Sequence, residues 1–414
     1  KKNPQMSEHP QPKQNKFKFI MKKGSGAFAD VIQAENTKTG QMVAIKRMKQ
    51  TYRSIDQIVQ LREIMSLKVL ATHPNIVRLL EILFDKSSGK LALVFELMSH
   101  DMYQTIRNRK NQLPQNQVRW YIFQILNGLK ASHQEGYFHR DMKPENVLVQ
   151  KNGESWTGDV VKLSDFGSAR QIGSELPYTE YISTRWYRPP EVLLSDGVYG
   201  QEMDIFGLGC VMYELIELHP LFPGKDEFDQ ICRIHNVIGA PPSDVIKRLR
   251  KGAKNNPIKT EFQQVKGCGV ACMMTNPSEA VVDLIEKMLE YDPTKRINAV
   301  DCLKHPYFDE MDLVFAELRR DKYLDETYLK DLEDVWLSTR QGMVKSRPQV
   351  EPQKPKLAKP KTVKPKPTGQ PGNVITIGGN SLQQPQKMPG NHQGTVTLPN
   401  INKMIYYKPG GPKK

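Results

Sequence analysis

The segment 139–146 gathers side chains that suit one kind of chemistry, the transfer of a phosphoryl group. That reaction needs phosphates that are held, charge that is neutralised, and an acceptor hydroxyl that is aimed in line. Asp141 can accept the hydroxyl proton, Lys143 can neutralise charge on the transferred phosphate, and Asn146 can bind Mg²⁺. A charged turn after a helix is the alternative, and agreement at so many neighbouring positions argues against it.

A second Mg²⁺ ligand is predicted 24 residues after Asp141, where Asp165, Phe166 and Gly167 follow a short apolar stretch. The Asp165 carboxylate offers the hard oxygen that Mg²⁺ prefers. Such a tripeptide is common by chance, so its value as a signal comes from its position. The segment 151–159 is rich in Gly and polar residues, and we predict a loop between two strands there.

Gly24, Ser25 and Gly26 form a turn between two predicted strands, and glycines let a backbone turn approach phosphate oxygens closely. An ordinary hairpin is the alternative for this turn. Lys46 lies in an apolar strand, and Glu63 follows in the next predicted helix. The spacing allows an ion pair that aims the Lys46 ammonium at phosphates, while a solvated edge lysine stays open as the alternative.

The hydrophobic pattern around these residues changes along the chain. The first part, through Val94, reads mostly as strands and contains one helical stretch, 54–70. From Asp101 onward helical spacing dominates, with an amphipathic helix at 118–133 and a buried helix at 203–218. This order predicts an α+β fold. The strands are predicted at 18–23, 29–34, 42–48, 82–84 and 91–95.

The 414-residue chain is 38% hydrophobic and 25% charged, so much of it can bury a core. Its apolar runs are far shorter than the ~20 residues that span a bilayer. Residues 1–16 are polar, and we expect a flexible leader rather than a signal peptide. The five cysteines are scattered without paired spacing, which predicts free thiols in a reducing compartment.

The net charge of +15 lies mainly at the end of the chain, because residues 340–414 hold 14 Lys and Arg against one acid, Glu351. That leaves about +2 for the rest, which argues against a nucleic-acid-binding fold. We expect a helical extension at 309–345 and a disordered Pro/Lys-rich tail at 346–414. The tail is either a solvated linker or a basic segment that docks on an acidic surface. Residues 398–409 regain apolar side chains, which suits a docking peptide.

The motifs, taken in order over residues 17–308, resemble those of eukaryotic protein kinases. Glu191 lies in a segment similar to the Ala-Pro-Glu motif, Asp204 resembles the buried Asp of the central helix, and Arg296 resembles the partner of Glu191. Segments 186–188 and 221–224 are typical of the CMGC group. The lip, 177–188, is most similar to the MOK branch of the MAK/MOK (RCK) kinases. The MAP-kinase acidic docking patch and the cyclin-contacting helix are not evident.

The resemblance implies a two-lobed protein kinase fold that holds ATP and Mg²⁺ in its cleft and phosphorylates protein Ser or Thr. Val31, Ala44 and Leu148 would enclose the adenine, and Phe95 would be the gatekeeper. The other implied ATP contacts are Lys23, Gly24, Ser25, Gly26, Lys46, Glu63, Glu96, Met98 and Asp101.

The resemblance also suggests a switch, in which phosphorylation of Thr179 and Tyr181 activates the enzyme through an upstream kinase or autophosphorylation. A phosphate carries about two negative charges and binds arginine forks well. The alternative is that each arginine sits in an ordinary surface pair. The predicted phosphate-binding residues are Arg62, Arg140 and Arg170 for Thr179, and Arg185 and Arg188 for Tyr181.

Two other functions stay open. A pseudokinase scaffold is favoured only by three departures from the family pattern, at Lys23, Ala29 and Pro189. An interaction protein that works through its basic tail is the second. We expect a monomer that acts on protein substrates in the cytoplasm. The resemblance adds the cilium or flagellum, whose length MOK-like kinases restrain, and the nucleus.

Overall fold

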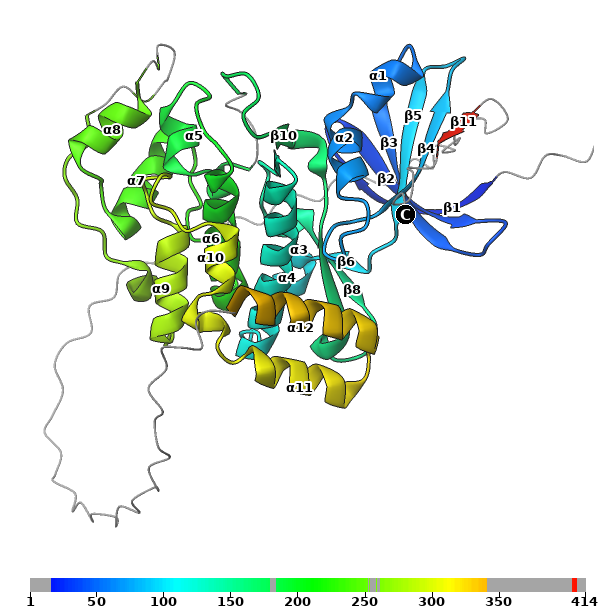
Figure 1. The fold of residues 1–414 in the computed structure, drawn as a ribbon. Coiled ribbons are helices and arrows are strands. Elements are labelled where there is room, and N and C mark those ends of the chain that lie inside the picture. The colour runs from blue at the N-terminus through cyan, green and yellow to red at the C-terminus, as the bar shows by residue number, and fades with distance from the viewer. Residues whose placement is uncertain are drawn as a thin grey trace, which may run out of the picture. The chain divides into compact units, whose positions relative to one another are not determined.

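The computed structural model describes residues 16–178, 184–251, 253, 258 and 261–340, with the backbone of 404–407. The described chain forms a small β-rich lobe followed by a larger helical lobe (Figure 1), which confirms the two-lobed α+β prediction. Residues 1–15 and most of the predicted tail lie outside the described residues. None of the described helices has the length and apolar content of a membrane span. All five cysteines are unpaired thiols.

The small lobe is built on one antiparallel sheet in the order β1-β2-β3-β5-β4-β11. Alternation along β3 puts Val43 and Ile45 in an outer apolar cluster with Phe17, while Ala44 and Lys46 face the other side. The five predicted strands are present, each with wider bounds. Their bounds are β1 Phe17–Ser25, β2 Ala29–Asn36, β3 Met42–Thr51, β4 Leu79–Asp85, β5 Lys90–Glu96 and β11 Met404–Tyr407.

The stretch 54–70 was predicted as one helix, and this prediction is wrong. The structure has α1 (Ile55–Val59) and α2 (Arg62–Val69), separated where Leu61 takes an extended backbone. In one continuous helix, Ile58 and Ile64 would point about 120° apart. The break lets both side chains reach the core, where each is at most 4% exposed.

The larger lobe is centred on two buried helices that confirm the predicted ones, α4 (Gln115–Gln134) and α6 (Glu202–Glu217). Short strands and turns of this lobe carry the polar motifs, since one 3₁₀ turn contains Asn146 and another directly follows Asp165. The other helices are α3 Met102–Ile106, α5 Pro190–Leu194, α7 Glu227–Ile238, α8 Ser243–Leu249, α9 Glu279–Met288 and α10 Ala299–Leu303. The strands are β6 His100–Asp101, β7 Tyr137–Phe138, β8 Val147–Lys151, β9 Asp159–Leu163 and β10 Arg170–Gln171. The 3₁₀ turns are η1 Pro144–Asn146, η2 Trp156–Gly158, η3 Phe166–Ser168, η4 Arg185–Tyr187, η5 Val270–Met273 and η6 Pro306–Phe308.

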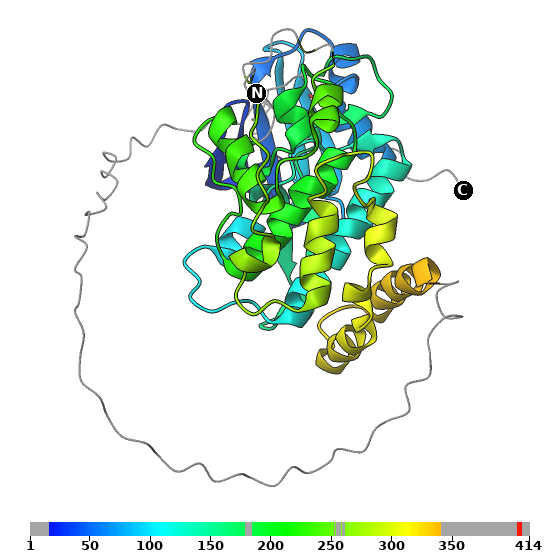
Figure 2. The same cartoon turned by 90° about the vertical axis from the view of Figure 1, so that its left-hand side faces the viewer.

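The helical extension predicted after residue 309 forms two helices, α11 (Met311–Asp321) and α12 (Glu326–Arg340), rather than one stretch. Lys322 ends α11 with a left-handed backbone, φ +55°, which turns the chain. Figure 2 shows the pair side by side at one end of the lobe. Phe315 of α11 packs on Trp120 of α4 with ring centroids 6.0 Å apart, and Trp336 of α12 packs on Phe315 at the same distance.

The tail was predicted to be disordered through residue 414, and this is wrong for Met404–Tyr407. These four residues form β11, which pairs antiparallel with β4. The apolar residues of 398–409 had predicted a docking peptide there, but not a strand. The strand exists because the edge of β4 supplies backbone hydrogen-bonding groups to pair with.

Candidate active site

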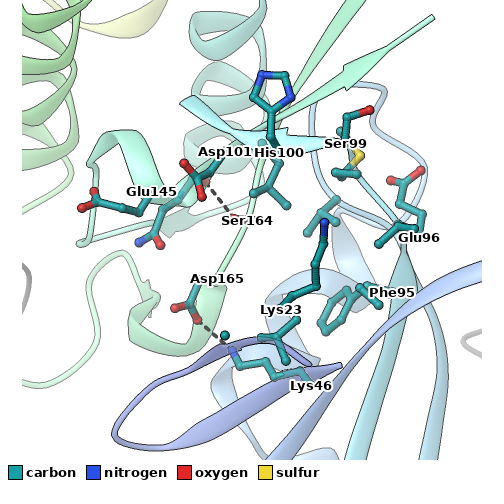
Figure 3. Close-up of a pocket in the computed structure, with 18 of the residues that line it drawn as sticks. Lys23, Lys46, Phe95, Glu96, Ser99, His100, Asp101, Glu145, Ser164 and Asp165 are labelled. Atoms are coloured by element: carbon teal, nitrogen blue, oxygen red, sulfur yellow. Dashed lines mark hydrogen bonds and ion pairs between the residues drawn. The ribbon is translucent and has the colours of Figure 1, made fainter. Parts of the chain in front are cut away.

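A cavity of about 340 Å³ lies between the two lobes. Most of the predicted ATP contacts line it, and Figure 3 shows Lys23, Lys46, Phe95 and Asp165 around the same space. Ser25 and Gly26 are not among the lining residues. The Ser25 hydroxyl instead donates to Asp30 at 2.6 Å, and the Gly26 N–H donates to the Ala29 carbonyl at 2.8 Å. The predicted residues that line the cavity are Lys23, Gly24, Val31, Ala44, Lys46, Glu63, Phe95, Glu96, Met98, Asp101, Asn146, Leu148 and Asp165.

The Lys46 ammonium is held by two carboxylates that come from different lobes. It donates to both Glu63 oxygens at 2.8 Å and to Asp165 Oδ1 at 2.8 Å. The ion pair with Glu63, which the spacing allowed, is therefore present. The alternative of a solvated edge lysine is excluded, because the Lys46 side chain is only 17% exposed.

The three groups alter one another's pKa values. Burial favours a neutral Lys46, but Glu63 and Asp165 outweigh it and raise the pKa of Lys46 above its ordinary value. Burial raises the pKa of Glu63, and Lys46 opposes part of that rise. For Asp165, burial is again outweighed by Lys46, which leaves the pKa of Asp165 below its ordinary value. The cavity therefore keeps a charged ammonium and an ionised Asp165 at neutral pH.

The backbone before Asp141 is fixed by a carboxylate in the large lobe. Asp204, near the start of α6, accepts the backbone N–H groups of His139 and Arg140, each at 2.7 Å. Arg140 has φ +73°, an uncommon conformation for a residue with a side chain, and these bonds help to hold it. The predicted Arg296–Glu191 ion pair is also present, buried, with distances of 2.6 and 3.0 Å.

Asp141, Lys143 and Asn146 lie together beside the cavity. Lys143 Nζ donates to Asp141 Oδ2 at 2.8 Å, and Asn146 Nδ2 donates to the same oxygen at 2.8 Å. Asp141 Oδ1 is buried and has no hydrogen-bond partner among the described residues. A buried acceptor without a donor is costly, so this oxygen is suited to receive a hydroxyl from a bound molecule.

Arg62, Arg140 and Arg170 come from α2, the loop before Asp141 and β10. The guanidinium groups of Arg140 and Arg170 both lie 5.7 Å from the ring centre of Tyr178. Burial is the largest influence on the pKa values of Arg62 and Arg140, and repulsion from Arg170 lowers both further. The three positive charges thus share one region. Thr179 and Tyr181 lie outside the described residues.

The remaining two predicted arginines have a common acidic neighbour. Arg185 Nε and one terminal nitrogen of Arg188 lie 3.3 and 3.4 Å from the same oxygen of Glu227. Arg185 also donates to the Lys225 carbonyl at 2.9 Å. Both arginines are thus ion-paired, as in the alternative that the sequence left open, although Arg188 is buried rather than at the surface. Glu227 would have to share both arginines with any phosphate.

Several residues at these sites were missed by the sequence reasoning. Tyr178 directly precedes Thr179, so adjacency was a usable signal, whereas Tyr199 had none. The Tyr199 ring lies 5.6 Å from the Arg140 guanidinium. Gln104 and Ser164 line the cavity and carry no motif of their own.

Comparison with known proteins places these observations in a family. The "Protein kinase domain" family model matches residues 17–308. The "MAPK/MAK/MRK overlapping kinase" of Homo sapiens is 45% identical over 294 residues, which is 71% of this chain and 68% of the relative. "Cyclin-dependent kinase F-4" of Oryza sativa subsp. japonica is 43% identical over 71% of this chain and 61% of the relative. "Serine/threonine-protein kinase MAK" of Homo sapiens is 39% identical, over 71% and 45%.

Proposed function

The chain belongs to the protein kinase family, as a serine/threonine protein kinase of the MOK and MAK group, and from this premise we propose that its cavity uses Mg²⁺-ATP and is activated by phosphorylation of Thr179 and Tyr181. The observation that carries the catalytic part is the Lys46 ammonium bound to Glu63 and Asp165 at 2.8 Å. A pseudokinase would have no need to keep this arrangement intact.

The walls of the cavity support an adenine site. Val31 and Ala44 from the sheet and Leu148 from β8 all line it, which suits a flat apolar ring. The Glu96 carboxylate is bound to Lys162 at 2.7 Å and to the Arg78 N–H at 2.8 Å. The Glu96 side chain is therefore already occupied by these two partners. We propose that the backbone groups of Glu96 and Met98 hold the base, with Asp101 near the ribose.

The donor set suits Mg²⁺. Asn146 and Asp165 both line the cavity and offer oxygen atoms, which are the ligands that Mg²⁺ takes, and it commonly uses one or two protein ligands together with phosphates. Within the described residues no cluster of three or more His, Cys, Asp or Glu suggests a different metal. Bound there, the ion would neutralise phosphate charge. Lys46 would hold the α- and β-phosphates of the nucleotide.

We propose that the acceptor hydroxyl of the protein substrate binds at Asp141. Its Oδ1 has no described donor, so it can accept the hydrogen of a Ser or Thr hydroxyl and orient the oxygen for attack. Lys143 is bound to the other oxygen of Asp141 at 2.8 Å, close enough to stabilise negative charge that develops on the transferred phosphate.

Activation is proposed from the arginines. A phosphate on Thr179 would meet Arg62, Arg140 and Arg170, whose mutual repulsion it would relieve. The Nε atom of Arg170 is buried without a hydrogen-bond partner among the described residues, which also favours an anion there. A phosphate on Tyr181 would compete with Glu227 for Arg185 and Arg188.

The test is phosphate transfer from Mg²⁺-ATP to a generic basic protein, followed by mapping of the phosphates on the chain itself. We expect transfer by the wild type, near-complete loss in Asp165→Asn and Asp141→Asn, and normal activity in the exposed control Asp56→Asn. We also expect Thr179→Ala with Tyr181→Phe to lower activity. Absence of transfer, even after another kinase has phosphorylated Thr179 and Tyr181, would favour the scaffold; unchanged activity of the double variant would contradict the switch.

The place of action in a cilium or flagellum is a proposal that rests on the family resemblance alone. Imaging of a tagged full chain, with and without residues 346–414, would test it and would also show whether the basic tail directs localisation.

A further inference from the structure

Strand β4 is buried on both faces, although it lies beyond β5 as the outermost of strands β1 to β5 on that side of the sheet. Ile82 and Phe84 pack in the core below the sheet, and Leu83 packs in the outer cluster with Phe17. These three β4 side chains are between 0 and 3% exposed. Both faces of β4 are therefore apolar, so exposure of either face would bring apolar side chains into water.

An outer strand of this kind needs its backbone covered. The side of β4 away from β5 presents N–H and C=O groups that attract any extended chain, and proteins usually protect such an edge with Pro, Lys or a bulge. The register irregularity of β4 lies earlier, between Leu79 and Glu81, and residues 82–85 contain none of these devices. The stretch 82–85 is the part of the edge that requires a partner.

Strand β11 covers that stretch. Its register with β4 pairs Met404 with Asp85 and Tyr407 with Ile82, antiparallel and without a shift between them. In Figure 1 the short red strand lies beside β4. The sequence Met-Ile-Tyr-Tyr has high strand propensity, and Pro399 and Pro409 flank it.

We propose that the outer edge of β4, residues 82–85, is a binding site for an extended peptide, and that its occupant is the segment Met404–Tyr407 of the same chain. Binding is by strand addition, in which main-chain hydrogen bonds supply most of the affinity. Four residue pairs make only a few such bonds, so the segment docks reversibly.

The same chain is favoured over a second copy for a reason of concentration. Residues 341–403 connect α12 to β11, and tethering within one chain gives a docking segment an effective concentration on the order of millimolar. A second copy at micromolar concentration competes poorly with it.

Hydrogen–deuterium exchange of the full chain tests the proposal. Proline at position 405 removes a backbone N–H and disfavours the strand, so we expect Ile405→Pro to accelerate exchange of the outward-facing amides of 82–85 about 10-fold or more. The matched control Ile401→Pro, which lies before the strand, should leave this exchange unchanged. Exchange in α4 reports whether each variant remains folded.

A synthetic peptide of residues 398–409 provides the rescue. Added in excess to Ile405→Pro, it should restore the slow exchange of 82–85, whereas a scrambled peptide should not. Equal exchange of the 82–85 amides in Ile405→Pro and the wild type would contradict the proposed binding site on β4. Protection in the wild type that grows with protein concentration, together with a dimer in light scattering, would overturn the same-chain occupant.

Discussion

At the scale of single residues, the buried carboxyl group of Glu214 lowers the stability of the folded protein in a pH-dependent way. The Tyr187 hydroxyl donates to Glu214 Oε2 at 2.7 Å, and Glu214 is 4% exposed. Burial raises the pKa of Glu214 from 4.5 to about 7, against the opposing effect of the Tyr187 hydrogen bond. The group is therefore neutral in the folded protein over a range in which it is ionised in the unfolded chain.

The expected consequence is a loss of stability between about pH 4.5 and 7 that depends on Glu214. Below pH 4.5 both states are protonated and the group costs nothing; above pH 7 both are ionised and the folded state bears the cost of burying the charge. For a pKa difference from 4.5 to about 7 this amounts to about 3 kcal/mol at most. Glu214→Gln keeps an acceptor for Tyr187 and should become more stable relative to the wild type as pH rises.

Urea unfolding at pH 5 and pH 8 measures this effect. The difference in unfolding free energy between Glu214→Gln and the wild type should grow by about 2–3 kcal/mol from pH 5 to pH 8. The exposed control Glu154→Gln should show no such growth. Parallel pH profiles for wild type and Glu214→Gln would mean that Glu214 ionises normally.

At the scale of elements, the loop between β8 and β9 packs against the end of α11 and the turn that follows it. The Thr157 hydroxyl donates to Asp321 at 2.7 Å, and the ring of Tyr323 lies against Gly153. A Cβ atom on Gly153 would come within 2.7 Å of Tyr323 Cγ, closer than real contacts allow. Because Asn146 lies just before β8 and Asp165 just after β9, this packing stabilises the two strands that hold the site residues.

Gly153→Ala should therefore destabilise the protein by about 1–2 kcal/mol through overpacking, with a lower melting temperature. Thermal unfolding of Gly153→Ala, Tyr323→Ala and the double variant measures the coupling. The double variant should regain most of the stability that Gly153→Ala loses, because the clash is removed. Additive losses would show that the alanine acts on the backbone of the loop and not through Tyr323.

At the scale of the whole molecule, Arg62 is the small lobe's contribution to the arginine cluster. It lies on α2, one residue before Glu63, so an anion bound by Arg62 would also fix the helix that positions Lys46. Arg140 precedes Asp141, and Arg170 follows Asp165 by five residues. One phosphate could thereby join both lobes through three segments.

We expect Arg62→Ala to reduce the activation that phosphorylation of Thr179 produces by about 10-fold, the order of one or two lost charge-assisted hydrogen bonds. Basal activity of the unphosphorylated chain should change little. The measurement is transfer activity of phosphorylated and unphosphorylated protein, with the exposed Arg53→Ala as the control. Equal activation of Arg62→Ala and wild type would remove Arg62 from the switch.

Much of this molecule was predictable from the sequence, because the signals were local. The period of the apolar residues gave the five strands of the small lobe and helices α4 and α6, and the motifs around Lys46, Asp141 and Asp165 marked the residues that meet at the cavity. Backbone preference and short-range spacing decide these features.

Only the tertiary structure decided the rest. The break at Leu61, the Asp204 bonds to the backbone before Asp141, and the place of Tyr199 beside Arg140 all depend on groups distant in sequence. Strand β11 depends on an edge more than 300 residues earlier in the chain. A four-residue segment of high strand propensity is still too short to be stable as a strand alone, so its structure also requires the hydrogen-bonding groups of β4.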